Sequence, residues 1–427
     1  MNLLEIANDI PVARVQATVR TGSGSDAAGR DGMARMAGEM LRRGAGGRGR
    51  ADLDEALDGL GADLGASVDA ESVSVVGHVL SRNLGPFLRI FETVLLRPDF
   101  GEAEVEKLRR EMRAGLDDLR DDDHELCARF FRRMLYGEHP YGRPPSGTAA
   151  SIEAIRREDL IAFHRAAFVR DNLFFGASGD LEAARAQGWF DTLGQSFPDG
   201  APPATVYLPD PARPVGRRLL LVDKPERTQA QVLLGHPAVR WGEPDDTPLR
   251  VAVAAFGGTF TSPLMTEVRV KRGLSYGAYA QLVHGRGQGH LQGWVFPAAH
   301  QVVETLRIVL DLWDRLAEGD IPRDQADFAK AYLLGRFPLT LSTPENRLSL
   351  RAALEVCGLP ADYLQSYPAR IAAVSHDEVR AVARRRVTSS DLAITVVATA
   401  EELEPVLDRA AAALRLDSIE VVAYDSF

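Results

Sequence analysis

Hydrophobic and polar positions follow an order of strand, helix, strands and helices that occurs twice along the chain. Strands are expected where apolar and polar residues alternate or where a short apolar run stands alone, and helices where apolar residues recur every three to four positions. In the first half these patterns predict strands at 13–20, 67–80 and 173–177 and helices at 32–43, 84–96, 102–119 and 155–168. The pattern is typical of an α+β protein.

The second half repeats this plan, and one stretch aligns without gaps at an offset of 219. In that stretch, LFFGASGD follows the helix of the first half and LAITVVAT follows the helix of the second. The matched apolar positions are Ile155, Leu160, Phe163 and Phe168 with Val374, Val379, Val382 and Val387. A duplicated α+β unit is the simplest account, and shared patterning without common ancestry is the alternative.

Six prolines lie between positions 198 and 214, close to the middle of the chain. Proline lacks the backbone N–H that a regular helix or a central strand needs, so this segment is expected to be an extended linker. We therefore predict two domains: residues 1–205 form an N-terminal α+β half, and residues 206–427 form a C-terminal α+β half.

Composition narrows the class of protein. Hydrophobic residues make up 45% and charged residues 26% of the 427 residues, as in soluble globular proteins, and no apolar run is long enough to span a bilayer. The start of the sequence does not have the pattern of a secretory signal, so a cytoplasmic protein is expected. The formal net charge is −10 and arginines are interleaved with acidic residues, which gives no indication of nucleic-acid binding. Cys127 and Cys357 are predicted to be buried thiols, with a disulfide as the less favoured alternative.

The motifs of a self-sufficient hydrolase do not occur in this sequence. Among the nine histidines, none stands in H-x-x-E-H or H-E-x-x-H. The glycine-rich segments TGSGSDAAGRDG and GAGGRGR lack the pattern of a phosphate-binding loop, and no Gly-x-Ser-x-Gly is found. We therefore expect no catalytic residue and no metal ligand that would act without a partner.

The most specific segment is FGGTFTSPLMTEVRVKRGLSYGAYAQL at 256–282. After a Gly-Gly turn, Ser262 and Leu264 open a helix, Arg269 follows, and Gly-Leu-Ser-Tyr ends at Tyr276. This segment resembles the pitrilysin family of zinc peptidases, which includes insulin-degrading enzyme and mitochondrial processing peptidase. HPYGRPPSGT at 139–148 is also similar to the family. The resemblance implies two homologous α+β halves, each a mostly antiparallel sheet flanked by helices.

The resemblance fails at the family's zinc helix. Active members have G-L-A-H-F-L-E-H-M-L, the inverzincin motif, where this chain has G-M-A-R-M-A-G-E-M-L from Gly32. Arg35 and Glu39 therefore stand at the zinc-ligand positions, and Gly38 stands at the position of the general base. Arginine cannot bind zinc, and residues four apart on a helix suit an ion pair. Glu111, seven residues after Glu104, matches the third ligand, although a solvated helix carboxylate is the alternative.

Arg269 and Tyr276 resemble the pair that binds peptide substrate in active members of the family, where both donate to the scissile oxygen. The alternative from spacing alone is a surface arginine and a tyrosine packed in a sheet. The resemblance implies a non-catalytic, peptide-binding subunit of a heterodimeric metallopeptidase, with zinc only in a homologous partner subunit and peptides as substrates. A structural scaffold subunit and a stand-alone peptide-binding protein remain as alternatives, and neither nucleic acid nor membrane is an expected partner.

Overall fold

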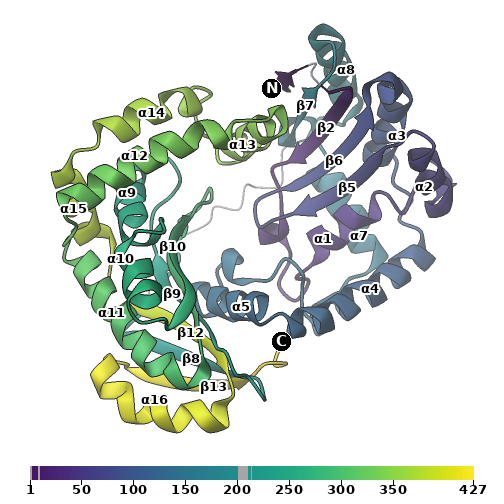
Figure 1. Cartoon of the computed structure of the whole chain (residues 1–427). Coiled ribbons are helices and arrows are strands. Elements are labelled where there is room, and N and C mark those ends of the chain that lie inside the picture. Colours follow the sequence, from purple (N-terminus) through teal and green to yellow (C-terminus); the bar gives the residue numbers. More distant parts are fainter. Residues whose placement is uncertain (1, 8–9, 201–209, 213) are drawn as a thin grey trace. The chain divides into compact units, whose positions relative to one another are not determined.

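The computed structural model describes residues 2–7, 10–200, 210–212 and 214–427, and most of the predicted proline-rich linker lies outside them. Two compact units are present, each built around one sheet (Figure 1). Unit 1 comprises Met1–Asp117, Arg143–Tyr207 and Thr340–Ala361. Unit 2 comprises Asp118–Gly142, Leu208–Leu339 and Asp362–Phe427.

Each unit contains one helix from the opposite half of the sequence. Helix α5 (Asp123–Tyr136) belongs to unit 2, and helix α13 (Pro344–Val356) belongs to unit 1. The predicted division at residues 205 and 206 follows the repeat in the sequence, whereas the compact units exchange these two segments.

The sheet of unit 1 has five strands in the order β1-β7-β2-β6-β5, and only the β1–β7 pair is parallel. Its strands are β1 (Asn2–Ile6), β2 (Val12–Val19), β5 (Asp63–Val68), β6 (Val73–Leu80) and β7 (Leu173–Gly179). The alternation predicted at 67–80 corresponds to β6 together with the end of β5. Strand β6 alternates strictly between buried and half-buried residues, which is the pattern of a strand with one face in the core.

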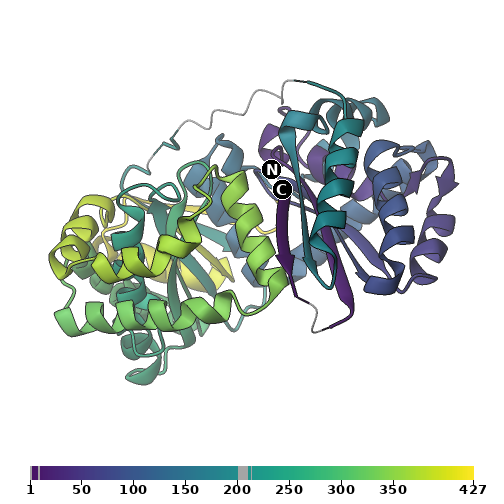
Figure 2. The same ribbon diagram turned by 90° about the horizontal axis from the view of Figure 1, so that it is seen from above.

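Helices cover both faces of this sheet (Figure 1, Figure 2). They are α1 (Met33–Met40), α2 (Arg50–Asp58), α3 (Leu84–Leu96), α4 (Glu102–Asp121), α6 (Ala149–Ala154), α7 (Arg157–Ala167), α8 (Ala183–Ser196) and α13. On one face, Phe190 of α8 stacks on Phe175 of β7, with ring centroids 5.3 Å apart. On the other face, Leu348 of α13 packs with Leu3 and Phe174. The small hairpin of β3 (Gly44–Ala45) and β4 (Arg48–Gly49) lies outside the main sheet.

The sheet of unit 2 has six strands in the order β10-β11-β9-β12-β8-β13. They are β8 (Arg217–Asp223), β9 (Gln231–Pro237), β10 (Ser275–Val283), β11 (His290–Pro297), β12 (Leu392–Ala398) and β13 (Ser418–Ala423). The pairs β8–β12 and β8–β13 are parallel, and the other pairs are antiparallel. Strand β10 therefore lies at one edge of the sheet.

The helices of unit 2 enclose the larger hydrophobic core of the protein. They are α9 (Asp246–Gly257), α10 (Pro263–Met265), α11 (Val302–Ala317), α12 (Arg323–Thr340), α14 (Tyr363–Ala373), α15 (His376–Arg386) and α16 (Ala400–Leu414), together with α5. Trp313 of α11 is fully buried in this core. Helix α5 packs on the opposite face, where the thiol of Cys127 donates to the carbonyl oxygens of Gln231 and Thr395 at 3.7 and 3.6 Å. Cys127 is buried as predicted, whereas Cys357 is only half-buried, and the two form no disulfide.

Short 3₁₀ segments complete the connections. They are η1 (Ser23–Ser25), η2 (Ser81–Asn83), η3 (Pro140–Gly142), η4 (Arg170–Asn172) and η6 (Ala299–Gln301). None of the helices in the described ranges is long and apolar enough to cross a membrane.

The two units repeat the same elements, as the sequence predicted. Helix α7 corresponds to α15, and strand β7 corresponds to β12; in both pairs the offset is 219 at each end. At the same offset, residues 33–40 of α1 fall at 252–259, so α1 corresponds to the end of α9 and the turn that follows it. The segment that begins with α10 comes later in the repeat than the equivalent of α1.

Candidate functional site

Helix α1 is held by a buried carboxylate at its N-terminus. Gly32, the N-cap, has a φ of +93°, and Oδ2 of Asp26 accepts a hydrogen bond from its backbone N–H at 2.9 Å. Oδ1 of Asp26 accepts from the N–H of Ala34, also at 2.9 Å. Burial raises the pKa of Asp26 to about 7 despite these two hydrogen bonds. Met36 and Met40 are fully buried, so the helix keeps its packing although its zinc motif is absent.

The three motif positions of α1 do not suit a metal ion. Nε of Arg35 donates to Oε1 of Glu39 at 2.8 Å, which confirms the ion pair predicted from their spacing. Gly38 is buried, and a Cβ added there would come within 3.2 Å of Cγ2 of Val68. A glutamate side chain at this position would therefore be in tight contact with Val68 of strand β5. The guanidinium of Arg35 supplies no lone pair for zinc.

Glutamates of helix α4 are held by arginines. Glu111, the predicted match to a third zinc ligand, pairs with Arg43, and Glu104 lies 3.4 Å from the same guanidinium. The Arg43 side chain is only 8% exposed. Hydrogen bonding from Arg43 holds the pKa of the Glu111 carboxyl below its usual value. Within the described ranges, no group of three or more His, Cys, Asp or Glu could hold a metal ion.

The segment that carries Arg269 has an unusual helical turn. After the short helix α10, whose N-cap Ser262 accepts from the N–H of Met265, the chain forms a π-helix over Thr266–Val270. The N–H of Lys271 donates to the carbonyl of Thr266 at 2.9 Å, five residues earlier. Gly273 then adopts a φ of +63°, as expected for the tight turn that leads into β10. Single π-helical turns often occur at functional sites.

A β-bulge sets the direction of Tyr276. The register of the β10–β11 pair shifts between Ser275 and Ala278. The hydroxyl of Ser275 donates to the carbonyl of Gly277 at 2.6 Å and accepts from the N–H of Phe296 at 3.0 Å. Tyr276 projects outward from this bulge, with 75% of the residue exposed. Bulges on edge strands commonly re-aim a side chain in this way.

Arg269 and Tyr276 lie against one another. The guanidinium carbon of Arg269 is 4.4 Å from the ring centroid of Tyr276 and 5.9 Å from that of Phe260. Phe260 is 68% exposed, so the guanidinium lies between two exposed aromatic rings, and Val270, the next residue along the chain, is 69% exposed. The neighbouring Glu267 pairs with Lys271 and Arg272 instead. In the part of the chain that the structure describes, neither the Arg269 guanidinium nor the Tyr276 hydroxyl has a hydrogen-bond partner.

This arrangement provides two adjacent donors that face outward. The guanidinium is fixed in charge and is oriented by stacking on the tyrosine ring. The tyrosine hydroxyl is a directional donor, and the exposed aromatic and aliphatic side chains around it can contact apolar side chains. The site is suited to hold a carbonyl or carboxylate oxygen next to an apolar group. With neither a base nor a metal donor in this surface, it can orient a substrate and stabilise negative charge.

The sequence predicted that Arg269 and Tyr276 present their side chains on the same side, and the structure places the guanidinium carbon 4.4 Å from the ring centroid. The sequence did not predict the backbone features and residues around them. The π-helical turn, the bulge and the position of Phe260 beside Arg269 were not expected. Phe260 lies nine residues before Arg269 and two residues after the Gly257–Gly258 pair, and a large apolar side chain in such a short connection was the available signal. Arg43, which neutralises Glu111, was also missed.

A duplicated α+β fold whose zinc-motif helix lacks its histidines, together with a stacked Arg–Tyr pair, defines a peptidase-like chain with no group in the described ranges that could hold a metal ion. Family models agree: residues 3–149 match the insulinase family of peptidases (peptidase family M16), and residues 154–333 match the peptidase M16 inactive domain. The chain belongs to the M16, or pitrilysin-like, peptidase family.

Relatives and solved structures support this assignment. An uncharacterized zinc protease of Mycobacterium bovis is 28% identical over 379 residues, which cover 87% of this chain and 85% of the relative. The non-peptidase homolog YmxG of Helicobacter pylori is 22% identical, with coverage of 91% and 89%. The crystal structure of a peptidase M16 inactive domain from Pseudomonas fluorescens has a TM-score of 0.84 at 24% identity and covers 93% of this chain and 95% of that chain. This likeness shows the same fold, and the family names fit a non-catalytic member.

Proposed function

We propose that this chain is the non-catalytic subunit of a heterodimeric zinc metallopeptidase, and that Arg269 and Tyr276 act on peptide substrate bound to a homologous, zinc-bearing partner subunit. The observation that supports this most is the state of the Arg–Tyr pair. Tyr276 is exposed, Arg269 is half-buried against its ring without an ion-pair partner among the described residues, and a π-helical turn and a bulge position the two side chains. Side chains that only pack against the fold do not require a π-helical turn and a β-bulge to orient them.

The state of helix α1 supports a division of labour between two chains. Arg35 and Gly38 supply neither a zinc ligand nor a general base, Glu39 is paired with Arg35, and the helix is well packed nonetheless. No catalytic step is therefore assigned to unit 1 of this chain. The partner would supply the metal and the base, and this chain would supply the donors.

In this proposal the two donors share one task. When a peptide carbonyl is attacked, negative charge develops on its oxygen, and donors already aimed at that oxygen lower the barrier. Arg269 provides a permanent positive charge, and the Tyr276 hydroxyl provides a second hydrogen bond. Stacking between them limits the freedom of the arginine, so less conformational entropy is lost when the substrate binds.

The experiment is reconstitution. The chain is mixed with a homologous subunit that carries H-x-x-E-H, the complex is isolated by size-exclusion chromatography, and cleavage of a quenched-fluorescence peptide library is measured. Cleavage by the complex, and by neither subunit alone, supports the proposal. A stable complex whose activity does not change when Arg269 and Tyr276 are substituted would favour a scaffold subunit. Tight binding of peptides by this chain alone, without formation of a complex, would favour a stand-alone peptide-binding protein.

A further inference from the structure

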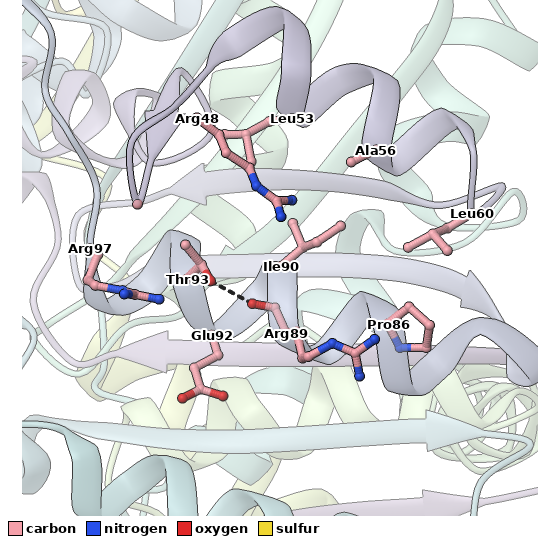
Figure 3. A pocket seen from close by; sticks show the side chains of 11 residues that line it. Arg48, Leu53, Ala56, Leu60, Pro86, Arg89, Ile90, Glu92, Thr93 and Arg97 are labelled. Carbon is pink, nitrogen blue, oxygen red and sulfur yellow. Dashed lines mark hydrogen bonds between the residues drawn. The ribbon is translucent and has the colours of Figure 1, made fainter.

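Unit 1 has a hollow of about 570 Å³ that is lined by helices α2 and α3 and by the hairpin of β3 and β4 (Figure 3). The apolar part of its lining includes the half-buried Leu60 and Pro86 and the buried Ile90. Three arginines, Arg48, Arg89 and Arg97, complete the polar part. A hollow of this volume is in the range of ligand-binding sites in proteins.

The glycine-rich segment GAGGRG positions one of these arginines. Gly46 and Gly47 have φ angles of +61° and +79°, which form the tight turn between β3 and β4. The N–H of Gly46 donates to the carbonyl of Arg97 at 2.8 Å, and the N–H of Gly47 donates to the carboxylate of Asp99 at 3.2 Å. The hairpin is thus fastened to the end of α3, and Figure 3 shows Arg48 reaching from it toward Ile90.

The charge of the hollow is positive, although the chain as a whole has a formal charge of −10. Glu92 is the acidic residue among the described lining residues, against three arginines. The side chains of Arg48, Arg89 and Arg97 form neither hydrogen bonds nor ion pairs with the residues that the structure describes. Three guanidinium groups against one carboxylate around one hollow, none of them in an ion pair with a described residue, favour an anionic ligand.

The spacing of the arginines indicates the kind of anion. Arg89 and Arg97 are eight residues apart along α3 and its C-terminal end, which corresponds to about 12 Å of helix axis. A ligand whose negative charges lie several ångströms apart suits two guanidinium groups carried by backbone positions at this separation. The apolar side chains of Pro86 and Ile90 lie on the same helix, so a ligand that contacts the whole hollow combines separated negative charges with an apolar group.

We propose that this hollow binds an acidic peptide segment, with carboxylates on Arg48, Arg89 and Arg97 and an apolar side chain on Leu60, Pro86 and Ile90. A peptide meets the spacing because its carboxylates lie on successive residues several ångströms apart. An inorganic polyphosphate could match the charges, but it would leave the apolar lining uncovered. This site is independent of Arg269 and Tyr276, and its existence does not depend on the proposed peptidase role.

Fluorescence anisotropy of the full chain tests the proposal. The probe is a fluorescein-labelled nonapeptide with two glutamates at each end and leucines between them, and the matched probe has glutamines in place of the glutamates. Variants are the triple change Arg48→Gln, Arg89→Gln and Arg97→Gln, and Arg110→Gln as a control, since Arg110 is an exposed arginine of α4 outside the hollow.

We expect the acidic peptide to bind the wild-type chain and the Arg110 control equally, and to bind the triple variant about tenfold or more weakly, with a smaller dependence on salt. The glutamine peptide should bind weakly to all of them. Equal binding of the acidic peptide to the triple variant, or no binding to the wild-type chain, would overturn the proposal. Binding of tripolyphosphate in place of the peptide, lost in the same variant, would overturn the assignment to a peptide.

Discussion

Replacing Arg43 by methionine tests how much its ion pairs with Glu104 and Glu111 contribute to the stability of unit 1. Methionine keeps the apolar part of the side chain, so the change mainly removes the guanidinium that pairs with Glu104 and Glu111. A hydrogen bond to a charged group contributes about 1.5–3 kcal/mol when it is buried. The carboxylates of Glu104 and Glu111 are 27% and 44% exposed, which weakens the interaction through solvent screening.

We therefore expect Arg43→Met to destabilise unit 1 by about 1–2 kcal/mol, which lowers the melting temperature by roughly 2–8 °C for a unit of this size. The matched control is Arg113→Met, because Arg113 pairs with Glu153 at 3.2 Å with both side chains more than half exposed. This control should change stability by less than about 0.5 kcal/mol. Urea unfolding followed by circular dichroism gives both values.

The effect of Arg43 should also depend on pH with a definite sign. Its hydrogen bond lowers the pKa of Glu111 in the folded state, so the stability that the pair contributes is fully present above the unfolded pKa near 4.5. That contribution is lost as the pH falls through the lowered pKa. The difference between wild type and Arg43→Met should therefore shrink in acid. Equal stability of the two proteins at pH 7, or a difference that grows in acid, would refute this account of the arginine.

Three further predictions concern other parts of the molecule. The isolated chain should contain no stoichiometric zinc by elemental analysis, and its Arg43→Met variant should contain none either, because Arg35 cannot bind zinc and Glu39, the one carboxylate of α1, is paired with Arg35; zinc with chelator-sensitive proteolysis would contradict this. Burial lowers the pKa of His290 to about 4, so its imidazole is neutral in the folded protein down to a lower pH than in the unfolded chain. As the pH falls from 6.5 to 4, the free energy of unfolding of the wild type should decrease by up to about 3 kcal/mol more than that of His290→Gln. Parallel pH profiles of urea unfolding for the two proteins would argue against this. Phe260→Ala should reduce the turnover of a reconstituted complex by about two- to fivefold, because a cation–π contact at an exposed site is worth roughly 0.5–1 kcal/mol; an unchanged rate would remove Phe260 from the site.

Local features of the fold and the site could be predicted from sequence, and long-range ones could not. The Arg35–Glu39 ion pair follows from a spacing of four on a helix, and the proximity of Arg269 to Tyr276 follows from seven residues joined by a turn at Gly273. Both depend only on neighbouring backbone.

The pairing of Arg43 with Glu111 joins residues 68 positions apart, and no periodicity indicates it. The sequence also does not indicate that α5 belongs to unit 2 and α13 to unit 1. The pattern of an amphipathic helix shows which of its faces is apolar but not which sheet that face will cover. The bulge at Ser275–Ala278 depends on a hydroxyl that bonds to the next strand, and its signal is only a serine and a glycine. These features depend on contacts between residues far apart in the sequence, and local sequence patterns do not determine such contacts.

Steady-state kinetics of the reconstituted complex with Arg269→Ala and Tyr276→Phe tests the central claim most directly. Size-exclusion chromatography first establishes that each variant still assembles, as expected because Tyr276 is exposed, Arg269 is half-buried and neither is a large buried apolar anchor. By comparison with loss of one oxyanion donor, either change should raise the barrier by roughly 2.7–4 kcal/mol, or about a hundredfold or more in turnover. Turnover close to wild type in an intact complex that carries both changes would contradict the account.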